Sequence, residues 1–373
     1  MCTSYTPRMT RLARRILLAG SALAGLLAAL VLGRAWQRLK RSQYQSAGEL
    51  PLRAPEILPG AGVMPYRRFG ATGLSVSEVG FGAWAIGGKA YGTVQRQDSL
   101  EALARAEELG CNLVDTAMIY GDSELVLGEF LRGRRSRWIV ATKYSFQRAG
   151  LTATLEAQLQ RLGTDVIDFY QLHWLPEDPR LYEELYALKK AGKVRFVGAS
   201  VYSASDIDAV IDHGQLDGVQ LPFSLLDPDP FLLRVERLRA SGLAVLIRSS
   251  LKEGFLAGKF RPDTTFPDSN DQRHLWSTRR IARTVEQAER FRFLETNGGS
   301  LRRAAVAYPL SYPEVSAVLL GTKTATQADD NFREGPGARL TAASLRQIAA
   351  VQDELDAGGR RTLMGRVRRA QGR

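Results

Sequence analysis

The stretch that decides the fold class is residues 138–172, WIVATKYSFQRAGLTATLEAQLQRLGTDVIDFYQL. It begins with a short apolar run, 138–142, in which β-branched and aromatic residues are frequent, as is typical of a buried strand. Residues 151–161 follow with apolar positions at helical spacing, and a second apolar run, 167–172, ends the unit. A strand, a helix and another strand in this order indicate a parallel sheet with helical crossovers.

The same unit recurs along the chain. We expect the other strands at 79–82, 112–115, 195–199, 218–222, 244–247 and 316–320, and the other helices at 98–109, 124–131, 181–190, 204–211 and 231–240. Gly110, Gly192 and Gly242 stand where three of these helices should end. Eight strands that alternate with helices over residues 64–356 predict a (β/α)8 barrel, the TIM-barrel class of α/β folds.

A doubly wound nucleotide-binding fold is the alternative, and it requires a G-x-G-x-x-G turn that opens a helix. Residues 80–88 (GFGAWAIGG) are rich in glycine but have a different spacing, so the barrel is the better prediction. The interval between the last two strands is too long for one crossover, and its segment 252–297 holds the turn-rich run RPDTTFPDSND. Because this segment follows a strand, we expect it at the C-terminal face of the barrel, where lids and substrate contacts are found.

The net charge of +12 lies in the ends of the chain. Residues 1–63 hold nine Arg or Lys against two Glu, and residues 357–373 hold six Arg and no acid, so residues 64–356 are nearly neutral. A near-neutral body has no large basic face for a phosphate backbone, which argues against nucleic acid as a partner. Two cysteines, and three histidines without zinc-ligand spacing, argue against a disulfide scaffold and a metal site.

Residues 16–33 (ILLAGSALAGLLAALVLG) carry no charge and would span about 27 Å as a helix, close to the roughly 30 Å hydrocarbon core of a membrane. Arg14, Arg15 and Arg34 flank the run, and Trp36 stands where interfacial aromatic residues are found. We therefore expect a single transmembrane helix within residues 1–41, followed by a linker at 42–63 that is rich in Pro and Gly. The alternatives are an export signal, since Arg14-Arg15 resembles a twin-arginine motif, and a start of translation at Met64.

The C-terminal end is the Arg-rich tail 357–373. Its composition leads us to expect irregular structure and contact with anionic lipid.

Polar side chains cluster at the predicted C-terminal ends of three neighbouring strands. The second strand ends at Asp115 and is followed by Tyr120, the third leads into Lys143, and the fourth is followed by His173. Each residue alone has an ordinary structural explanation, as a turn cap, a packed ring, a solvated strand end or a core histidine. Together they are harder to explain in this way, because a lysine at the end of an apolar barrel strand needs an anion.

The grouping equips the site to protonate an oxygen. A phenol is a weak acid near neutrality, with an ordinary pKa of about 10, and a neighbouring ammonium lowers that pKa. A carboxylate would hold the ammonium in place, and an imidazole would orient a carbonyl oxygen toward the phenol. Since no side chain supplies a hydride, reduction of that carbonyl would require a nicotinamide cofactor.

With these residues in this order, the chain resembles the aldo-keto reductase family from about Met64 to Leu355. The resemblance includes residues 66–77 (YRRFGATGLSVS) and the four residues at the strand ends. It implies that Tyr120 is the general acid and base, that Lys143 and Asp115 tune it, and that His173 orients the substrate. It also places Trp84 and Trp174 near the substrate.

The same resemblance implies sites for NADP(H), in preference to NAD(H). Ser200 and Gln220 match the positions that bind the nicotinamide amide. The remaining cofactor positions follow the seventh and eighth strands: Arg248, Ser249, Leu251, Gly321, Thr322, Lys323, Gln327 and Asn331. The residues after the eighth strand, from Gly321 to Asn331, form a strand-to-helix turn, where free backbone N–H groups attract phosphate. Lys323 adds a cation that favours a 2′-phosphate.

Four positions depart from the family pattern. Arg248 occupies a position at which members usually have a Tyr that stacks on the nicotinamide. Ala83 stands where many members have Thr, Val201 where many have Asn, and Gln327 where several NADP-dependent members have Arg. These differences concern the cofactor rather than the four strand-end residues.

We therefore predict an NAD(P)H-dependent carbonyl reductase that converts aldehydes or ketones to alcohols reversibly. One alternative is a membrane-tethered, NADP(H)-binding regulatory barrel with little turnover, as in the potassium-channel β subunits of this family. Another is an epimerase or isomerase that uses the same acid without hydride exchange. We place the barrel in the cytoplasm, where reduced NADP is regenerated.

Overall fold

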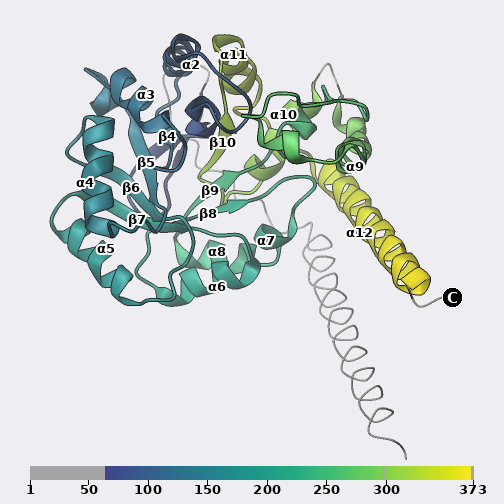
Figure 1. The fold of residues 1–373 in the computed structure, drawn as a ribbon. Helices are drawn as coiled ribbons and strands as arrows, with labels where there is room; N and C mark the ends of the chain where they lie inside the picture. The colour runs from purple at the N-terminus through teal and green to yellow at the C-terminus, as the bar shows by residue number, and fades with distance from the viewer. Residues whose placement is uncertain (1–63, 297–298, 371–373) are drawn as a thin grey trace, which may run out of the picture. The chain divides into compact units, whose positions relative to one another are not determined.

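A computed structural model describes residues 64–296 and 299–370, with side chains as far as residue 357. Its centre is a closed barrel of eight parallel strands that pair in chain order from β3 to β10, and β10 then pairs with β3 (Figure 1). The strands are β3 (Val79–Gly82), β4 (Leu113–Asp115), β5 (Ile139–Tyr144), β6 (Ile167–Leu172), β7 (Val194–Ser200), β8 (Gly218–Pro222), β9 (Ala244–Arg248) and β10 (Ala317–Gly321). Each coincides with one predicted apolar run to within two residues, so the barrel prediction is confirmed and the doubly wound fold is excluded.

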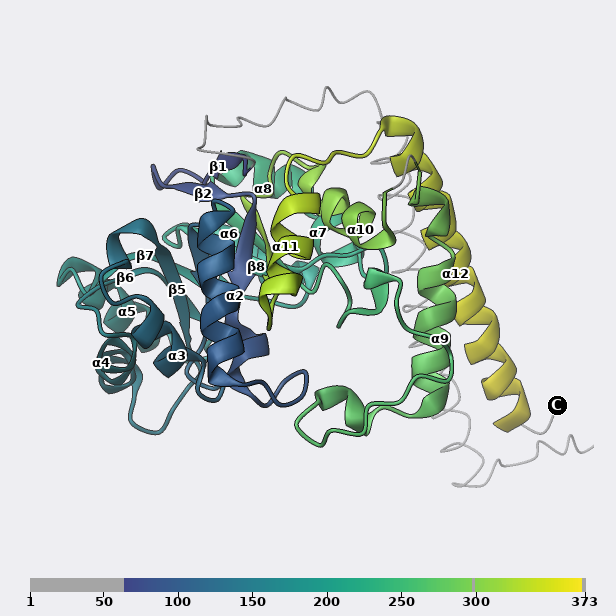
Figure 2. The same ribbon diagram turned by 90° about the horizontal axis from the view of Figure 1, so that it is seen from above.

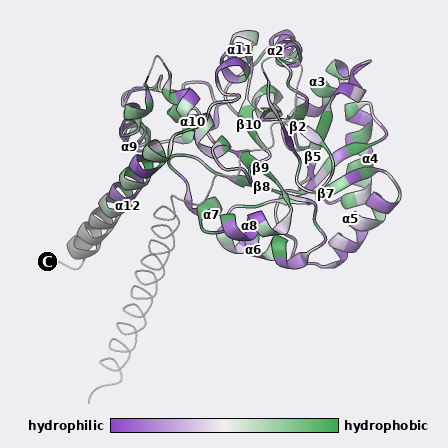
Figure 3. Ribbon diagram, turned by 180° about the vertical axis from the view of Figure 1, so that it is seen from behind, coloured by the Kyte–Doolittle hydropathy of each residue, from purple (hydrophilic) through white to green (hydrophobic). Residues whose placement is uncertain are grey.

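Helices that follow the strands cover the outside of the barrel, as Figure 3 shows from the opposite side. They are α2 (Arg96–Glu108), α3 (Ser123–Phe130), α4 (Leu151–Leu162), α5 (Arg180–Lys190), α6 (Ala204–His213) and α11 (Ala325–Glu334). The predicted helix at 231–240 is two helices, α7 (Asp229–Leu232) and α8 (Val235–Ser241), because Arg234 leaves helical geometry with a φ of −131°. Gly242 ends α8 in the left-handed conformation, as expected of a C-terminal glycine.

The N-terminal end of the barrel is closed by an antiparallel hairpin of β1 (Tyr66–Arg68) and β2 (Ser75–Ser77), which the periodicity did not predict. Phe69 in its turn is fully buried and meets the ring of Phe169 edge-on, with centroids 5.0 Å apart. Gly198 leaves room for Phe169, since a Cβ there would lie 2.3 Å from the ring. Burial of each ring contributes about 1.5–3 kcal/mol, so the hairpin stabilises the barrel from this end.

The long segment after β9 carries η3 (Phe255–Ala257), η4 (Gln272–Leu275), α9 (Thr278–Glu289) and η5 (Arg292–Leu294), and α10 (Leu301–Leu310) precedes β10. It has a small core of its own, made by Phe255, Ile281 and Val285. The segment before α9 reaches the loop that precedes α2 (Figure 2). Gln272 donates its backbone N–H to the carbonyl of Ala90 at 2.9 Å, so the segment spans from the end of β9 to the loop after β3.

At the C-terminus, α12 (Ala342–Ala370) continues through most of the Arg-rich tail, so the expectation of irregular structure there is wrong. Its Ala, Leu, Gln and Arg residues are strong helix formers, which explains the difference. The predicted transmembrane helix at 16–33 and the linker at 42–63 lie outside the described residues. Among the helices that the structure describes, none combines the length and the apolar character needed to cross a membrane.

Candidate active site

A cavity of roughly 800 Å³ lies at the C-terminal ends of the barrel strands, where the predicted site residues were expected. Its lining comes from strand ends and from the long segment after β9. Twelve of the sixteen predicted residues line it: Trp84, Asp115, Tyr120, His173, Gln220, Arg248, Ser249, Leu251, Gly321, Lys323, Gln327 and Asn331. The structure thus brings together residues separated by more than 200 positions in the sequence.

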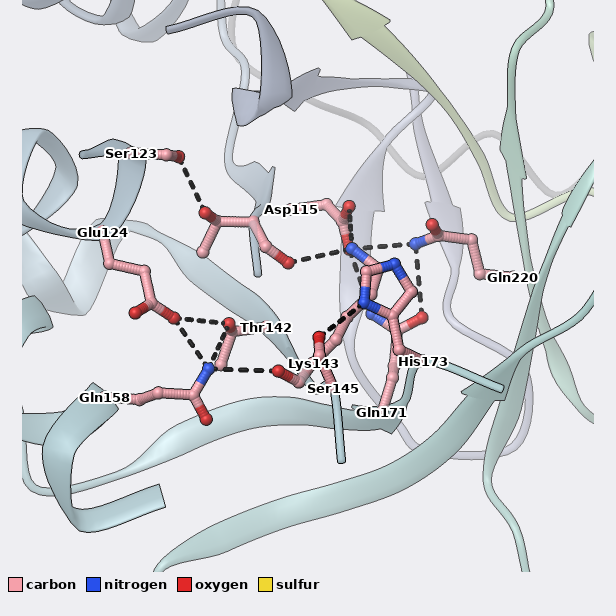
Figure 4. Close-up of polar contacts among 11 residues, drawn as sticks. Asp115, Ser123, Glu124, Thr142, Lys143, Ser145, Gln158, Gln171, His173 and Gln220 are labelled. Carbon is pink, nitrogen blue, oxygen red and sulfur yellow. Dashed lines mark hydrogen bonds and ion pairs between the residues drawn. The ribbon is translucent and has the colours of Figure 1, made fainter. Parts of the chain in front are cut away.

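Lys143 lies at the floor of the site, fully buried on β5. Its Nζ donates to Asp115 Oδ2 at 2.6 Å and to the carbonyl of Thr116 at 2.8 Å (Figure 4). Asp115 Oδ1 accepts two further bonds, from Gln171 Nε2 at 3.0 Å and from Gln220 Nε2 at 2.9 Å. The carboxylate is therefore satisfied on both oxygens, and its attraction, together with that of Tyr120, outweighs burial and raises the pKa of Lys143.

Tyr120 lies above this ion pair, with its ring centroid 4.9 Å from Lys143 Nζ. Burial raises the pKa of Tyr120 above its ordinary value, and the Lys143 ammonium acts in the opposite direction. The turn that carries Tyr120 packs tightly against Gly87, where a Cβ would lie 1.9 Å from the Tyr120 carbonyl oxygen. The phenol is thus held as a neutral proton donor next to a cation that stabilises its conjugate base.

His173 faces the same space. Its ring centroid is 5.8 Å from that of Tyr120, and its Nδ1 is 2.7 Å from Ser145 Oγ. Burial, Lys143 and Arg248 together lower the pKa of His173 to about 3. The imidazole is therefore neutral at physiological pH, and it can donate or accept one hydrogen bond without adding a charge.

Behind Lys143, a buried polar network fixes the end of β5 (Figure 4). Gln158 on α4 donates from Nε2 to the carbonyl of Lys143 at 3.1 Å and to Glu124 Oε1 at 2.7 Å. Thr142 donates to the same Glu124 oxygen at 2.8 Å. Burial raises the pKa of Glu124. Removing any member would leave a buried partner unsatisfied, so the network holds the Lys143 backbone in position.

Three buried serine hydroxyls at or after the ends of strands have no hydrogen-bond partner among the described residues. They are Ser200 Oγ at the end of β7, Ser224 Oγ after β8 and Ser250 Oγ after β9. Ser200 pairs in register with Gln220 on β8. Buried hydroxyls without partners are uncommon, and here Ser200 is itself a position predicted to bind the nicotinamide amide, while Ser250 lies between the predicted cofactor positions Ser249 and Leu251.

The far end of the cavity is a strand-to-helix turn between β10 and α11. Thr324 caps α11 by accepting from the N–H of Gln327, and Asn331 Nδ2 donates to Thr322 Oγ1 at 2.9 Å. Lys323 Nζ donates to the carbonyl of Tyr91 at 2.7 Å, and burial lowers its pKa. Besides Arg248, three further cations line the same cavity: Lys259, Arg273 and Arg302. This end of the cavity suits an anion with several negative charges.

Arg273 connects this wall to the long segment. It is almost fully buried, forms an ion pair with Asp271 at 2.6 Å and donates to the carbonyl of Glu253 at 2.8 Å. Its guanidinium also lies 4.9 Å from the ring centroid of Tyr91 and 4.2 Å from that of Phe266. These contacts join the segment after β9 to the loop after β3 across the cavity.

Arg248, at the end of β9, donates from Nη2 to the carbonyl of Val201 at 3.0 Å. Its guanidinium lies 4.2 Å from the centroid of the exposed Tyr202 ring. Within the part of the chain that the structure describes, Arg248 forms no ion pair. An unpaired guanidinium therefore borders the cavity close to His173 and Tyr120.

Comparison with known proteins decides the family. The sequence profile of the aldo/keto reductase family matches residues 78–353. The chain belongs to the aldo/keto reductase family. It is therefore an oxidoreductase of a family whose members reduce carbonyl groups with nicotinamide cofactors.

Several relatives illustrate this membership. The chain is 31% identical to the aldo-keto reductase YhdN of Bacillus subtilis over 57% of this chain and 69% of that protein. It is 28% identical to the NADH-specific methylglyoxal reductase of Escherichia coli over 70% and 90% of the two chains. Among solved structures, the glycerol dehydrogenase AKR11B4 of Gluconobacter oxydans is similar with a TM-score of 0.66 and 25% identity, over 80% of this chain and 95% of that one.

Within this aldo/keto reductase, four predicted residues do not line the cavity. Lys143 is beneath it, and Ser200 and Thr322 are buried behind its wall. Trp174 is 43% exposed and stacks on Phe146, with centroids 4.8 Å apart, because it follows His173 by one residue and its side chain turns to the other side of the chain.

Sequence reasoning missed Gln171 and the cations Lys259, Arg273 and Arg302. Gln171 had a signal, since it is the polar residue within the apolar run IDFYQL that precedes His173. The three cations lie outside the strand ends, since Lys259 and Arg273 belong to the long segment and Arg302 to α10, and no local pattern marks them.

Proposed function

We propose that this aldo/keto reductase reduces aldehydes or ketones to alcohols, with NADPH as the reductant and Tyr120 as the general acid. The observation that carries the proposal is the buried ion pair of Lys143 and Asp115 directly beneath the Tyr120 ring. In this arrangement the ammonium stabilises the phenolate that forms when Tyr120 gives its proton to the carbonyl oxygen. In the reverse direction the phenolate accepts the proton of the alcohol.

The residues present fit a dinucleotide. The unpartnered Ser200 hydroxyl and the Gln220 side chain adjoin the place for a carboxamide, and Lys323 and the start of α11 adjoin the place for the adenosine phosphate. Ser249, Leu251, Gly321, Thr322, Gln327 and Asn331 complete the proposed binding surface. When bound, the reduced nicotinamide supplies the hydride to the carbonyl carbon. His173 then orients the carbonyl oxygen by a neutral hydrogen bond, and Trp84 limits the substrate on one side.

Lys323 supports a preference for NADPH, because a lysine ammonium pairs with the 2′-phosphate that NADH lacks. One relative is named as NADH-specific, so the two cofactors must be compared directly. We expect NADPH to bind at least tenfold more tightly than NADH to the full chain. Lys323→Met should reduce this difference, and tighter binding of NADH by the native chain would refute the NADP preference.

The test of the reaction is NADPH oxidation with a panel of aldehydes and ketones that includes methylglyoxal. Tyr120→Phe should lower kcat by roughly 10²–10⁴-fold and leave the Kd of NADPH within twofold, since the phenol hydroxyl acts on the substrate. Unchanged turnover in this variant would refute the role of Tyr120. Tight NADPH binding without turnover on any carbonyl would favour a regulatory barrel, and activity without any nicotinamide would favour an isomerase.

We also propose that residues 16–33 anchor the barrel at a membrane, with the barrel in the cytoplasm. The uncharged run and its flanking arginines support this. A C-terminal reporter that is active only in the cytoplasm should be active in the fusion and sediment with membranes. Recovery of the fusion in the soluble fraction would refute the anchor, and an active periplasmic reporter would refute the orientation.

A further inference from the structure

Arg248 has an unusual place for a cation. In the β8–β9 register it lies opposite Pro222, two residues beyond Gln220, and its Nη2 reaches back over β8 to the carbonyl of Val201 beyond the end of β7. The guanidinium therefore spans the strand ends that carry Gln220 and Ser200. These two residues are the proposed carboxamide site, so Arg248 borders the place of the nicotinamide ring.

The charge of Arg248 is not neutralised by contact. No carboxylate within the described residues lies within ion-pair distance of it, although Glu253 lines the same cavity. The guanidinium also lies 4.2 Å from the centroid of the Tyr202 ring, and an aromatic ring leaves the full positive charge in place. The field of this charge reaches the reacting centre, since Arg248 contributes to the lowered pKa of His173 and acts to lower the pKa of Tyr120.

A reduced nicotinamide ring is neutral, and it becomes a cation when it gives up its hydride. A fixed cation beside the ring therefore repels the oxidised form and leaves the reduced form unaffected by charge. At separations of a few ångströms in a partly buried site this repulsion exceeds thermal energy. The phosphates are the same in both forms, so cations at the far end of the cavity do not distinguish them.

We propose that Arg248 makes the site selective for the reduced cofactor over the oxidised one, so that the enzyme is loaded with the reduced form when both are present and releases the oxidised form readily. This inference rests on the proposed function, because it requires a nicotinamide in the cavity. We expect the Kd of NADP⁺ to exceed that of NADPH by at least tenfold in the native chain. A tenfold ratio corresponds to a rise of about 30 mV in the potential of the bound two-electron couple.

The test is calorimetric or fluorescence titration of the full chain with NADPH and NADP⁺, without substrate. Arg248→Met should lower the ratio of the two Kd values about tenfold, and Arg248→Lys should keep most of it. Lys323→Met is the matched control, because it removes a cation from the same cavity and should weaken both forms equally.

Two results would overturn the inference. If Arg248→Met binds both forms with the native ratio, the charge does not act on the ring. If Arg248→Lys and Arg248→Met lower the ratio equally, the guanidinium acts through its shape. If the native chain binds none of NADPH, NADP⁺, NADH and NAD⁺, the proposed function is refuted as well. Failure of the proposed function therefore shows as absent binding, whereas failure of the Arg248 inference shows as binding with an unchanged ratio.

Discussion

The buried Lys143–Asp115 pair allows a quantitative prediction for Asp115→Asn. The asparagine keeps an oxygen that can accept from Gln171 and Gln220, so the side chain remains tied to its neighbours. Among the described residues, Asp115 provides the only carboxylate that contacts Lys143 Nζ, which has no exposed surface, and the substitution removes it. Breaking a buried ion pair by removing one partner costs about 3–5 kcal/mol, because an unpaired charge remains in the interior. We expect a loss of that size in the free energy of unfolding at pH 7.

The loss should depend on pH in a definite direction. In the native chain the pKa of Lys143 is raised, so the stabilisation by the pair is fully present below the unfolded pKa of about 10.4 and is lost only above it. In Asp115→Asn, the attraction of the carboxylate no longer counteracts burial, and burial lowers the pKa of Lys143 in the folded state below its value in the unfolded state. Folding then releases a proton, so the stability of the variant rises with pH and its deficit shrinks between pH 7 and 10.

Urea unfolding at pH 7.0 and 9.8 measures both quantities, and the other titrating groups cancel in the difference between variant and native chain. Asp168→Asn is the control, because the buried Asp168 accepts from Arg135 at 2.7 Å and from Arg195 at 2.8 Å. Arginine does not lose its proton in this range, so the control deficit should be equal at both pH values. A deficit of Asp115→Asn below about 1 kcal/mol, or one that is the same at both pH values, would refute the reasoning.

Three further predictions concern the same cavity. Because the pKa of His173 is about 3, the profile of kcat/KM should show no ionisation near pH 6.5, and a step there that disappears in His173→Gln would contradict this. Gly87→Ala should displace the Tyr120 turn and lower kcat about a hundredfold with little change in cofactor affinity; native kcat would contradict it. Arg273→Met should speed proteolysis within residues 259–276 about tenfold while the circular dichroism of the barrel is retained, and a native cleavage rate would argue that these contacts do not hold the segment.

The barrel strands could be predicted because each is a short apolar run between a turn and an amphipathic stretch, and both signals are local. The same holds for Asp115, Lys143 and His173, since a polar residue at the end of a buried strand is visible in the sequence and strand ends of a parallel barrel meet at one face. The break between α7 and α8 was not predictable in this way. It depends on a single residue, Arg234, that is compatible with a helix by propensity.

The hairpin at the N-terminal end and the long segment after β9 depend instead on contacts between distant parts of the chain. Thr93 binds Asp268 across 175 positions, and Phe69 packs on Phe169 across 100. Such pairs are not visible in the hydrophobic periodicity of the sequence, because periodicity reports local structure and the two partners meet only in the folded chain. The orphaned hydroxyl of Ser200 is of the same kind, since its lack of a partner is a property of the packed barrel.

The residues proposed for the chemistry lie at strand ends that the local sequence predicts, whereas those proposed for selectivity depend on contacts between distant parts of the chain. The proposed proton donation uses Tyr120, Lys143 and Asp115, which belong to two neighbouring strands and the turn after one of them, and their geometry follows once the barrel closes. The proposed selectivity depends instead on Arg248 and on the segment that Arg273 joins to the loop after β3. That segment encloses the cavity through tertiary contacts and can change in sequence without moving a barrel strand. A barrel of this design therefore keeps one reaction while its cofactor balance and its substrates diverge.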